Sequence, residues 1–127
     1  MTDTQNLRYT TTHEWLDVES QPMTMGITEH AQNLLGDIVF VELPEVGQEV
    51  KAGQEIGVLE SVKAAADFYA PISGTISEIN LNIKNQPELI NQDPFGQGWL
   101  CKITASNHAE TGSLLNIAAY SKEITQD

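Results

Sequence analysis

Short apolar segments, each ended by turn residues, are the feature that most constrains how this chain can fold. No apolar run exceeds four residues, and the two longest are Ile38–Val41 and Ile117–Tyr120. A membrane-spanning helix needs about 20 consecutive apolar residues, so we expect no membrane protein. With 127 residues, 40% of them apolar, the chain should form one compact domain of short strands. The clearest strand is the β-branched stretch Asp37–Leu43, which Pro44 ends.

Other alternating segments predict further strands. They cover residues 7–9, 15–18, 23–27, 56–62, 68–72, 75–83 and 99–104. Thr28 is placed to cap a helix of about two turns that ends at Gly36. Gly47-Gln48-Glu49-Val50 recurs six residues later as Gly53-Gln54-Glu55-Ile56, and the glycine at each start predicts two tight turns. The chain should therefore be mostly β.

Two connecting stretches complete this outline. Ser20-Gln21-Pro22 predicts a turn within an N-terminal hairpin. From Ser106 onward the apolar positions follow helical spacing, and Asn116 is suited to cap the second of two short helices. A helical tail should therefore follow the last strand.

The charge balance excludes some partners. Eighteen Asp and Glu against six Lys and Arg give a net charge of −12. A surface of that sign repels phosphate groups, so neither nucleic acid nor an anionic membrane is expected as a partner. The charge supports solubility and would steer encounters with larger proteins that carry basic patches.

The sequence holds few groups for catalysis or metal binding. The three histidines are His13, His30 and His108, and none lies beside Cys101 or at a metal-ligand spacing. We expect no metal site and no catalytic residue. Because the chain has one cysteine, it forms no internal disulfide and suits the cytoplasm. Cys101 alternates with Trp99 and Ile103, which predicts a buried and unreactive thiol on one strand face.

Lys63 is the exception, because its surroundings in the sequence suggest a chemical role. It stands in Val62-Lys63-Ala64-Ala65-Ala66, where small neighbours leave its amine accessible. Taken alone, the alanines favour a solvent-facing lysine on a helix. The flanking segments 56–62 and 68–72 instead favour a lysine at a hairpin tip, the place where carrier domains present an attachment point. Whether residues 60–67 form a turn or a helix stays open at this level.

The motifs of the chain together resemble the H proteins of the glycine cleavage system, which are lipoyl carriers. The matching segments are Tyr9, His13-Glu14-Trp15, Gly26-Ile27-Thr28, Ala31-Gln32, Leu35–Pro44, Glu60–Ala65, Asp67–Gly74, Pro87–Asn91 and Gly98–Leu100. Biotin carriers usually frame their lysine with methionines, so Val62 and Ala64 favour lipoate. The chain departs from the family at Ser20-Gln21-Pro22, where glycine is common, and around Thr111-Gly112.

The resemblance implies a fold and its organisation. It implies a mostly β lipoyl-type sandwich, or barrel-sandwich hybrid, of two antiparallel sheets with pseudo-twofold symmetry. Residues 1–127 would form a single carrier domain. Within it, residues 1–36 would supply an N-terminal hairpin and short helix, residues 37–104 the sandwich core, and residues 105–127 a helical tail.

The resemblance also implies a function. Lipoate would be attached covalently to Lys63 by a lipoate ligase or a lipoyl/octanoyl transferase. The lipoyl arm would carry an aminomethyl group from glycine decarboxylase (P protein) to aminomethyltransferase (T protein). Dihydrolipoamide dehydrogenase (L protein) would reoxidise the arm. The carrier itself would catalyse none of these steps.

The resemblance assigns four further residues. Thr12, Glu14 and Asp67 match the cleft that shelters the loaded arm, and Glu60 would help the lipoylating enzyme to recognise the hairpin. The alternative interpretation is that Glu14 and Asp67 have no specific role and are simply two of eighteen surface acids. Two other functions stay open: a relay that donates lipoate to other lipoyl domains, and a structural module in which Lys63 is unmodified.

Overall fold

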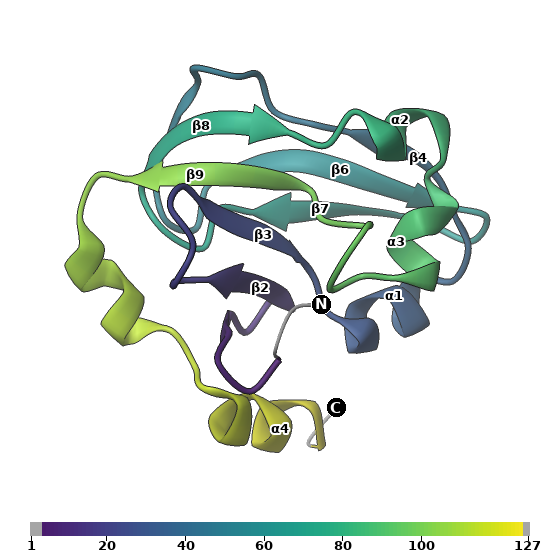
Figure 1. Ribbon diagram of the computed structural model, residues 1–127. Coiled ribbons are helices and arrows are strands. Elements are labelled where there is room, and N and C mark those ends of the chain that lie inside the picture. The colour runs from purple at the N-terminus through teal and green to yellow at the C-terminus, as the bar shows by residue number, and fades with distance from the viewer. Residues whose placement is uncertain (1–3, 126–127) are drawn as a thin grey trace.

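The computed structural model describes residues 4–125 as two antiparallel sheets with short helices (Figure 1). The strands are β1 (Arg8–Tyr9), β2 (Glu14–Asp17), β3 (Met23–Ile27), β4 (Ile38–Glu42), β5 (Glu49–Val50), β6 (Glu55–Ser61), β7 (Ala65–Tyr69), β8 (Gly74–Ile79) and β9 (Cys101–Ala105). The helices are α1 (Glu29–Leu35), α2 (Asn82–Asn85), α3 (Glu88–Gln92), the 3₁₀ helix η1 (His108–Ser113) and α4 (Ile117–Thr125).

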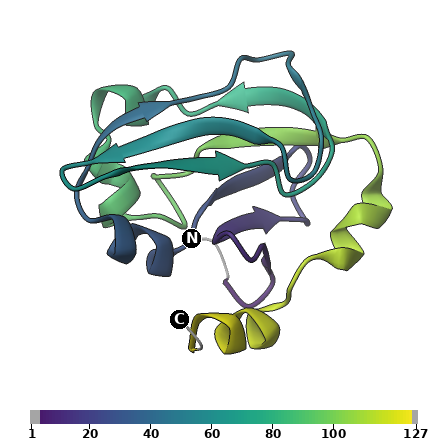
Figure 2. The same cartoon turned by 180° about the vertical axis from the view of Figure 1, so that it is seen from behind.

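The strands form one six-stranded and one three-stranded sheet, which confirms the expected fold class. The strand orders are β1-β2-β3-β9-β8-β5 and β4-β6-β7, and every pairing is antiparallel. Helices α1, α2 and α3 gather at one end of the sheets, η1 follows β9 at the opposite end, and α4 lies below the N-terminal strands (Figures 1 and 2). Among residues 4–125, no helix has the length and apolar character needed to cross a bilayer.

Two apolar clusters hold the fold together. The larger lies between the sheets, where Met25 and Ile103 of one sheet and Leu59 and Phe68 of the other are buried in one cluster. Gly57 on β6 allows Phe68 to pack closely, because a Cβ added there would lie 2.2 Å from the Phe68 ring. The smaller cluster joins the N-terminal strands to α4, and its buried members are Leu7, Tyr9, Trp15 and Tyr120.

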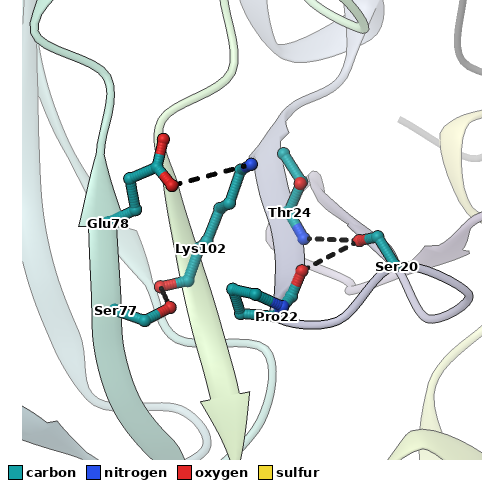
Figure 3. Close-up of polar contacts among 6 residues, drawn as sticks. All are labelled: Ser20, Pro22, Thr24, Ser77, Glu78 and Lys102. Atoms are coloured by element: carbon teal, nitrogen blue, oxygen red, sulfur yellow. Dashed lines mark hydrogen bonds and ion pairs between the residues drawn. The ribbon is translucent and has the colours of Figure 1, made fainter.

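The N-terminal hairpin turns where the sequence predicts it, although the usual glycine is absent. The Ser20 hydroxyl lies 3.1 Å from the carbonyl oxygens of Asp17 and Pro22 and accepts a hydrogen bond from the Thr24 N–H at 3.2 Å (Figure 3). The Gln21–Pro22 peptide bond is cis. A serine side chain thus stabilises the turn.

The short sequence repeat is also a structural repeat. Each Gly–Gln pair exchanges two backbone hydrogen bonds with one buried residue. The pairs are Gly47 and Gln48 with Ile76, and Gly53 and Gln54 with Ala70. Both glycines have positive φ, 91° and 84°, a conformation that glycine adopts without steric cost. The two predicted tight turns are therefore confirmed.

Two strand predictions are wrong near their ends. β8 stops at Ile79, and Ile83 lies in α2 rather than in an extended segment. Leu81 is 61% exposed while Ile83 is buried, so the apparent alternation of residues 79–83 crosses from a strand into a helix. The second segment, predicted as 68–72, is the strand Ala65–Tyr69. It begins earlier because it pairs with β6.

The predicted strand 99–104 also begins too early, and burial at its start does not follow the expected alternation. β9 starts at Cys101. Leu100, expected on the polar face, is fully buried, whereas Trp99 packs against the smaller cluster beside α4. The α3 helix after Pro87 was not predicted, although proline near a helix start is a known signal.

Cys101 lies in the core between the sheets, as predicted. Its side chain is fully buried, and burial raises the pKa of the thiol to about 12. Since the thiolate is the reactive form, a thiol reagent should label native protein negligibly and label unfolded protein completely. Mass spectrometry with and without denaturant measures this difference. Rapid labelling of the native protein would contradict the structure.

Candidate functional site

Lys63 lies at the tip of the hairpin that β6 and β7 form. Residues 62–64 connect the two strands, which decides between a turn and a helix in favour of the turn. The Ser61 hydroxyl accepts hydrogen bonds from the N–H groups of Lys63 at 3.1 Å and Ala64 at 3.0 Å. The Ser61 N–H donates to the Ala64 carbonyl at 2.7 Å. The backbone at the tip is therefore fixed while the Lys63 side chain is exposed.

Strand pairing overrides the helical propensity of the alanines. Ala65 and Ala66 lie opposite Glu60 and Leu59 in the β6–β7 ladder. Helix propensity differs by well under about 1 kcal/mol per residue among such side chains, and cross-strand hydrogen bonds outweigh it here. This pairing directs the hairpin tip past α1 (Figure 2).

The Lys63 side chain lies against the end of α1. Gly36 follows this helix with a φ of 83°. A Cβ added at Gly36 would lie 2.8 Å from Lys63 Cε and 3.5 Å from Nζ. Two features therefore favour glycine at position 36: the positive φ of the backbone and the close approach of the Lys63 side chain.

A groove of about 200 Å³ lies between α1 and β7, near the lysine. Leu35, which lines the groove, directly precedes Gly36, so the groove lies next to the contact with Lys63. The lining residues are Thr12, His13, Glu14, Ile27, Ala31, Leu34, Leu35, Leu59, Ala66, Asp67 and Phe68. The structure thus places Thr12, Glu14 and Asp67 in one groove whose walls are mostly apolar.

Glu14 is the buried acid of this groove, with a side chain that is 1% exposed. Its Oε1 accepts hydrogen bonds from the hydroxyls of Thr10 and Thr12, and its Oε2 accepts one from the Tyr69 N–H at 3.2 Å. Burial raises the pKa of Glu14, while these hydrogen bonds act in the opposite direction. Among residues 4–125, no lysine or arginine forms an ion pair with Glu14.

Asp67 and Glu60 have different surroundings from Glu14, because both are exposed. Asp67 approaches Glu55 of the neighbouring strand. Its hydrogen bond and its like charge raise the pKa of Glu55. Glu60 lies outside the groove on β6, opposite Phe40 of β4, which is 52% exposed. The three acids suggested by the sequence therefore occupy three distinct environments.

Sequence reasoning missed several residues of the site. Thr10 and Tyr69 hold the Glu14 carboxylate, and α1 supplies much of the apolar wall. The run of threonines before the His13-Glu14-Trp15 motif was a signal for the first of these. No local pattern pointed to Tyr69, whose contribution is a backbone N–H.

The histidine spacing in the sequence also concealed a contact. His13 and His30 have ring centroids 4.8 Å apart, although 17 positions separate them in the sequence. Within residues 4–125, no group of three acids, histidines or cysteines is placed to hold a metal ion. The two rings meet where the segment before β2 passes α1.

Known proteins resemble this chain over nearly its whole length. The family model described as "Glycine cleavage H-protein" matches residues 7–127. A "Glycine cleavage system H protein" of Legionella pneumophila is 55% identical over 122 residues, covering 96% of this chain and 98% of the relative. One of Thermotoga maritima is 52% identical over 120 residues, covering 94% and 97%. The crystal structure of a glycine cleavage system H protein from Mycobacterium marinum superposes with a TM-score of 0.88 at 38% identity, covering 95% of this chain and 98% of the other.

Proposed function

The chain belongs to the glycine cleavage H-protein family and is thus a component of that system, and we propose that Lys63 is its lipoyl attachment site. The observation that carries the proposal is the placement of an exposed amine, on a fixed hairpin tip, beside an apolar groove that holds a buried carboxylate. The residues present fit a lipoyl group. The amine is accessible for acylation, and the apolar walls suit an aliphatic chain.

When bound as an amide, the lipoyl group supplies a flexible arm with a redox-active dithiolane that accepts an aminomethyl cargo. Ala31, Leu35 and Phe68 would contact the aliphatic part of the arm in the groove. These contacts remove apolar surface from water and exclude water from the cargo. This chain carries the cargo and, in our proposal, catalyses no step on it.

Glu14 would accept a hydrogen bond from the protonated amine of the cargo. A buried carboxylate without a cationic partner is costly, and an ammonium group in the groove would compensate its charge. Thr12 and Thr10 orient the carboxylate through their hydroxyls. Asp67, at the exposed side of the same groove, would add negative charge near the entrance.

The hairpin face would be the surface that the lipoylating enzyme recognises. Glu60 is exposed there, beside Phe40 and Val62, which are 52% and 69% exposed. An acid among exposed apolar side chains suits a partner surface with an apolar recess and a basic rim. We propose a lipoate ligase or a lipoyl/octanoyl transferase for this role. Glycine decarboxylase, aminomethyltransferase and dihydrolipoamide dehydrogenase would be the partners of the loaded arm.

We also infer that residues 1–127 act as one carrier domain. Met23 of the N-terminal hairpin pairs with Ile103 of the last core strand. Tyr120 of α4 stacks on Tyr9 with ring centroids 4.7 Å apart. These contacts join the three segments 1–36, 37–104 and 105–127 through buried side chains.

Protein isolated from its own cell should carry one lipoyl amide, and it should be on Lys63. Lys102 is less suited, because its Nζ lies 3.8 Å from Glu78 (Figure 3) and 5.3 Å from the Trp99 ring centroid. Lys51 and Lys84 are exposed but lie at no hairpin tip beside the groove. Intact mass and peptide mapping measure both the number and the place of the modification. An unmodified Lys63, or modification spread over the other lysines, would refute the proposal.

A further inference from the structure

The hydroxyl of Tyr120, on the C-terminal helix α4, joins two side chains from distant parts of the sequence. It lies 2.8 Å from Nδ1 of His13 and 2.7 Å from Oγ1 of Thr28. Tyr120 is 3% exposed and Thr28 is 1% exposed. Two arrangements of protons satisfy both contacts. Either the Thr28 hydroxyl donates to the phenol and the phenol donates to His13 Nδ1, or His13 Nδ1–H donates to the phenol and the phenol donates to Thr28 Oγ1.

The two partners of Tyr120 belong to two segments that border the groove, the start of α1 and the residue before Glu14. Thr28 is the N-cap of α1, where its hydroxyl accepts from the Ala31 N–H at 3.2 Å, and Ala31 lines the groove. His13 also lines the groove and directly precedes Glu14. The Thr28 N–H also donates to the His13 carbonyl at 3.0 Å. The phenol therefore connects the helical wall to the segment that carries the buried acid.

The backbone of His13 shows why such a connection matters. Its φ is 73°, and it is the one non-glycine residue with positive φ in the described part of the chain. This conformation is unfavourable for a residue with a Cβ and persists only where surrounding contacts hold it. The contacts include the hydrogen bond from the His13 N–H to the Thr10 carbonyl at 3.1 Å, the one that its carbonyl accepts from Thr28, and the contacts of its ring with His30 and Tyr120. Glu14 follows immediately, so its direction depends on this residue.

We propose that Tyr120 is a positioning residue for the groove: through His13 and Thr28 it fixes the Glu14 carboxylate relative to α1. The proposal rests on the function proposed above for Glu14. It gives the tail helix a role in the carrier beyond covering the smaller apolar cluster. The stacked ring of Tyr9 holds the Tyr120 ring in place, with an interplanar angle of 11°.

Tyr120→Phe and Tyr9→Phe form a matched pair for the test. Each removes one phenol hydroxyl from the same buried cluster. The Tyr9 hydroxyl donates to the Thr4 carbonyl, and neither residue lines the groove. Any general loss of stability should therefore be similar in the two variants, and only Tyr120→Phe should disturb Glu14.

The first readout needs no lipoyl arm. The Tyr69 N–H donates to Glu14 Oε2, so its hydrogen exchange in the full chain, followed by NMR, reports whether the carboxylate stays in place. We expect exchange to be about two- to tenfold faster in Tyr120→Phe than in the wild type, the range that loss of a neutral hydrogen bond supports. Tyr9→Phe should exchange at the wild-type rate at this amide. Equal rates in Tyr120→Phe and wild type, or equal acceleration in both variants, would overturn the proposal.

The second readout is the rate at which the lipoylated, aminomethyl-loaded protein releases ammonia and formaldehyde. Tyr120→Phe should release them faster than the wild type, and Tyr120→Phe combined with Glu14→Ala no faster than Glu14→Ala alone, because Tyr120 acts through Glu14. If Glu14→Ala accelerates release and Tyr120→Phe does not, the positioning role is wrong while the role of Glu14 stands. If neither Glu14→Ala nor Tyr120→Phe changes release, the sheltering role of Glu14 fails as well.

Discussion

Lys63→Arg should give a folded protein that accepts no lipoate and supports no glycine cleavage. The guanidinium stays protonated at physiological pH, so it cannot act as the nucleophile that forms an amide bond. The side chain at position 63 is exposed, and arginine retains an aliphatic stem to lie over Gly36. Intact mass after incubation with a lipoylating enzyme measures the first effect. Glycine cleavage reconstituted with the partner enzymes measures the second, and its rate should fall to background.

Lys84→Arg is the matched control for this substitution. Lys84 is also exposed, but it lies in α2, and its variant should be lipoylated and active like the wild type. A Lys63→Arg protein that supports glycine cleavage without lipoate would disprove the assignment of the arm to this hairpin.

Glu14→Ala should leave lipoylation unchanged and shorten the lifetime of the loaded protein. A hydrogen bond to a charged group contributes about 1.5 to 3 kcal/mol, which corresponds to about tenfold or more in the ratio of docked to free arm. The release of ammonia and formaldehyde in the absence of aminomethyltransferase should accelerate accordingly. Glu123→Ala, which removes an exposed acid of α4, should leave the rate unchanged. Equal release from Glu14→Ala and wild type would mean that the buried acid does not guard the cargo.

The protection by Glu14 should depend on pH in a defined direction. Burial raises the pKa of Glu14, so the native protein binds this proton more readily than the unfolded chain. Above the raised pKa, ionised Glu14 therefore lowers the free energy of unfolding. This loss of stability is relieved as the pH falls through the raised pKa. Only the ionised form attracts an ammonium. The difference in release rate between wild type and Glu14→Ala should thus be largest above the raised pKa and vanish as pH falls through it.

Local sequence patterns predicted strands that their own residues define. They failed where contacts with other parts of the chain determine the structure. The β4 strand, Ile38–Glu42, lies within the predicted stretch 37–43 because β-branched residues and Pro44 define it locally. Residues 65 and 66 look helical in isolation, yet they form β7 because β6 lies beside them. Leu100 is buried in the larger apolar cluster while Trp99 is half-buried against the smaller one, and strand alternation cannot reveal a second cluster.

Only those residues of the candidate site that lie in family motifs could be predicted from the sequence. Thr12, Glu14 and Asp67 were assigned by resemblance, and the structure places them in one groove. The burial of Glu14 and the exposure of Asp67 follow from tertiary contacts, which a count of acids does not show. Tyr120 and His13 are separated by 107 positions, and no spacing rule connects residues at that distance.

The hydrogen bonds of Ser61 at the hairpin tip have a consequence for transport. Because the backbone of Lys63 is fixed by this side chain, the freedom of an attached arm lies in the rotatable bonds beyond its Cα. The arm is then a tether with a stationary anchor, and its length limits the volume that its free end can explore. A small, constant search volume sets a high effective concentration of the cargo at any active site that the hairpin reaches. Delivery is thereby governed by where the partner enzyme binds the hairpin.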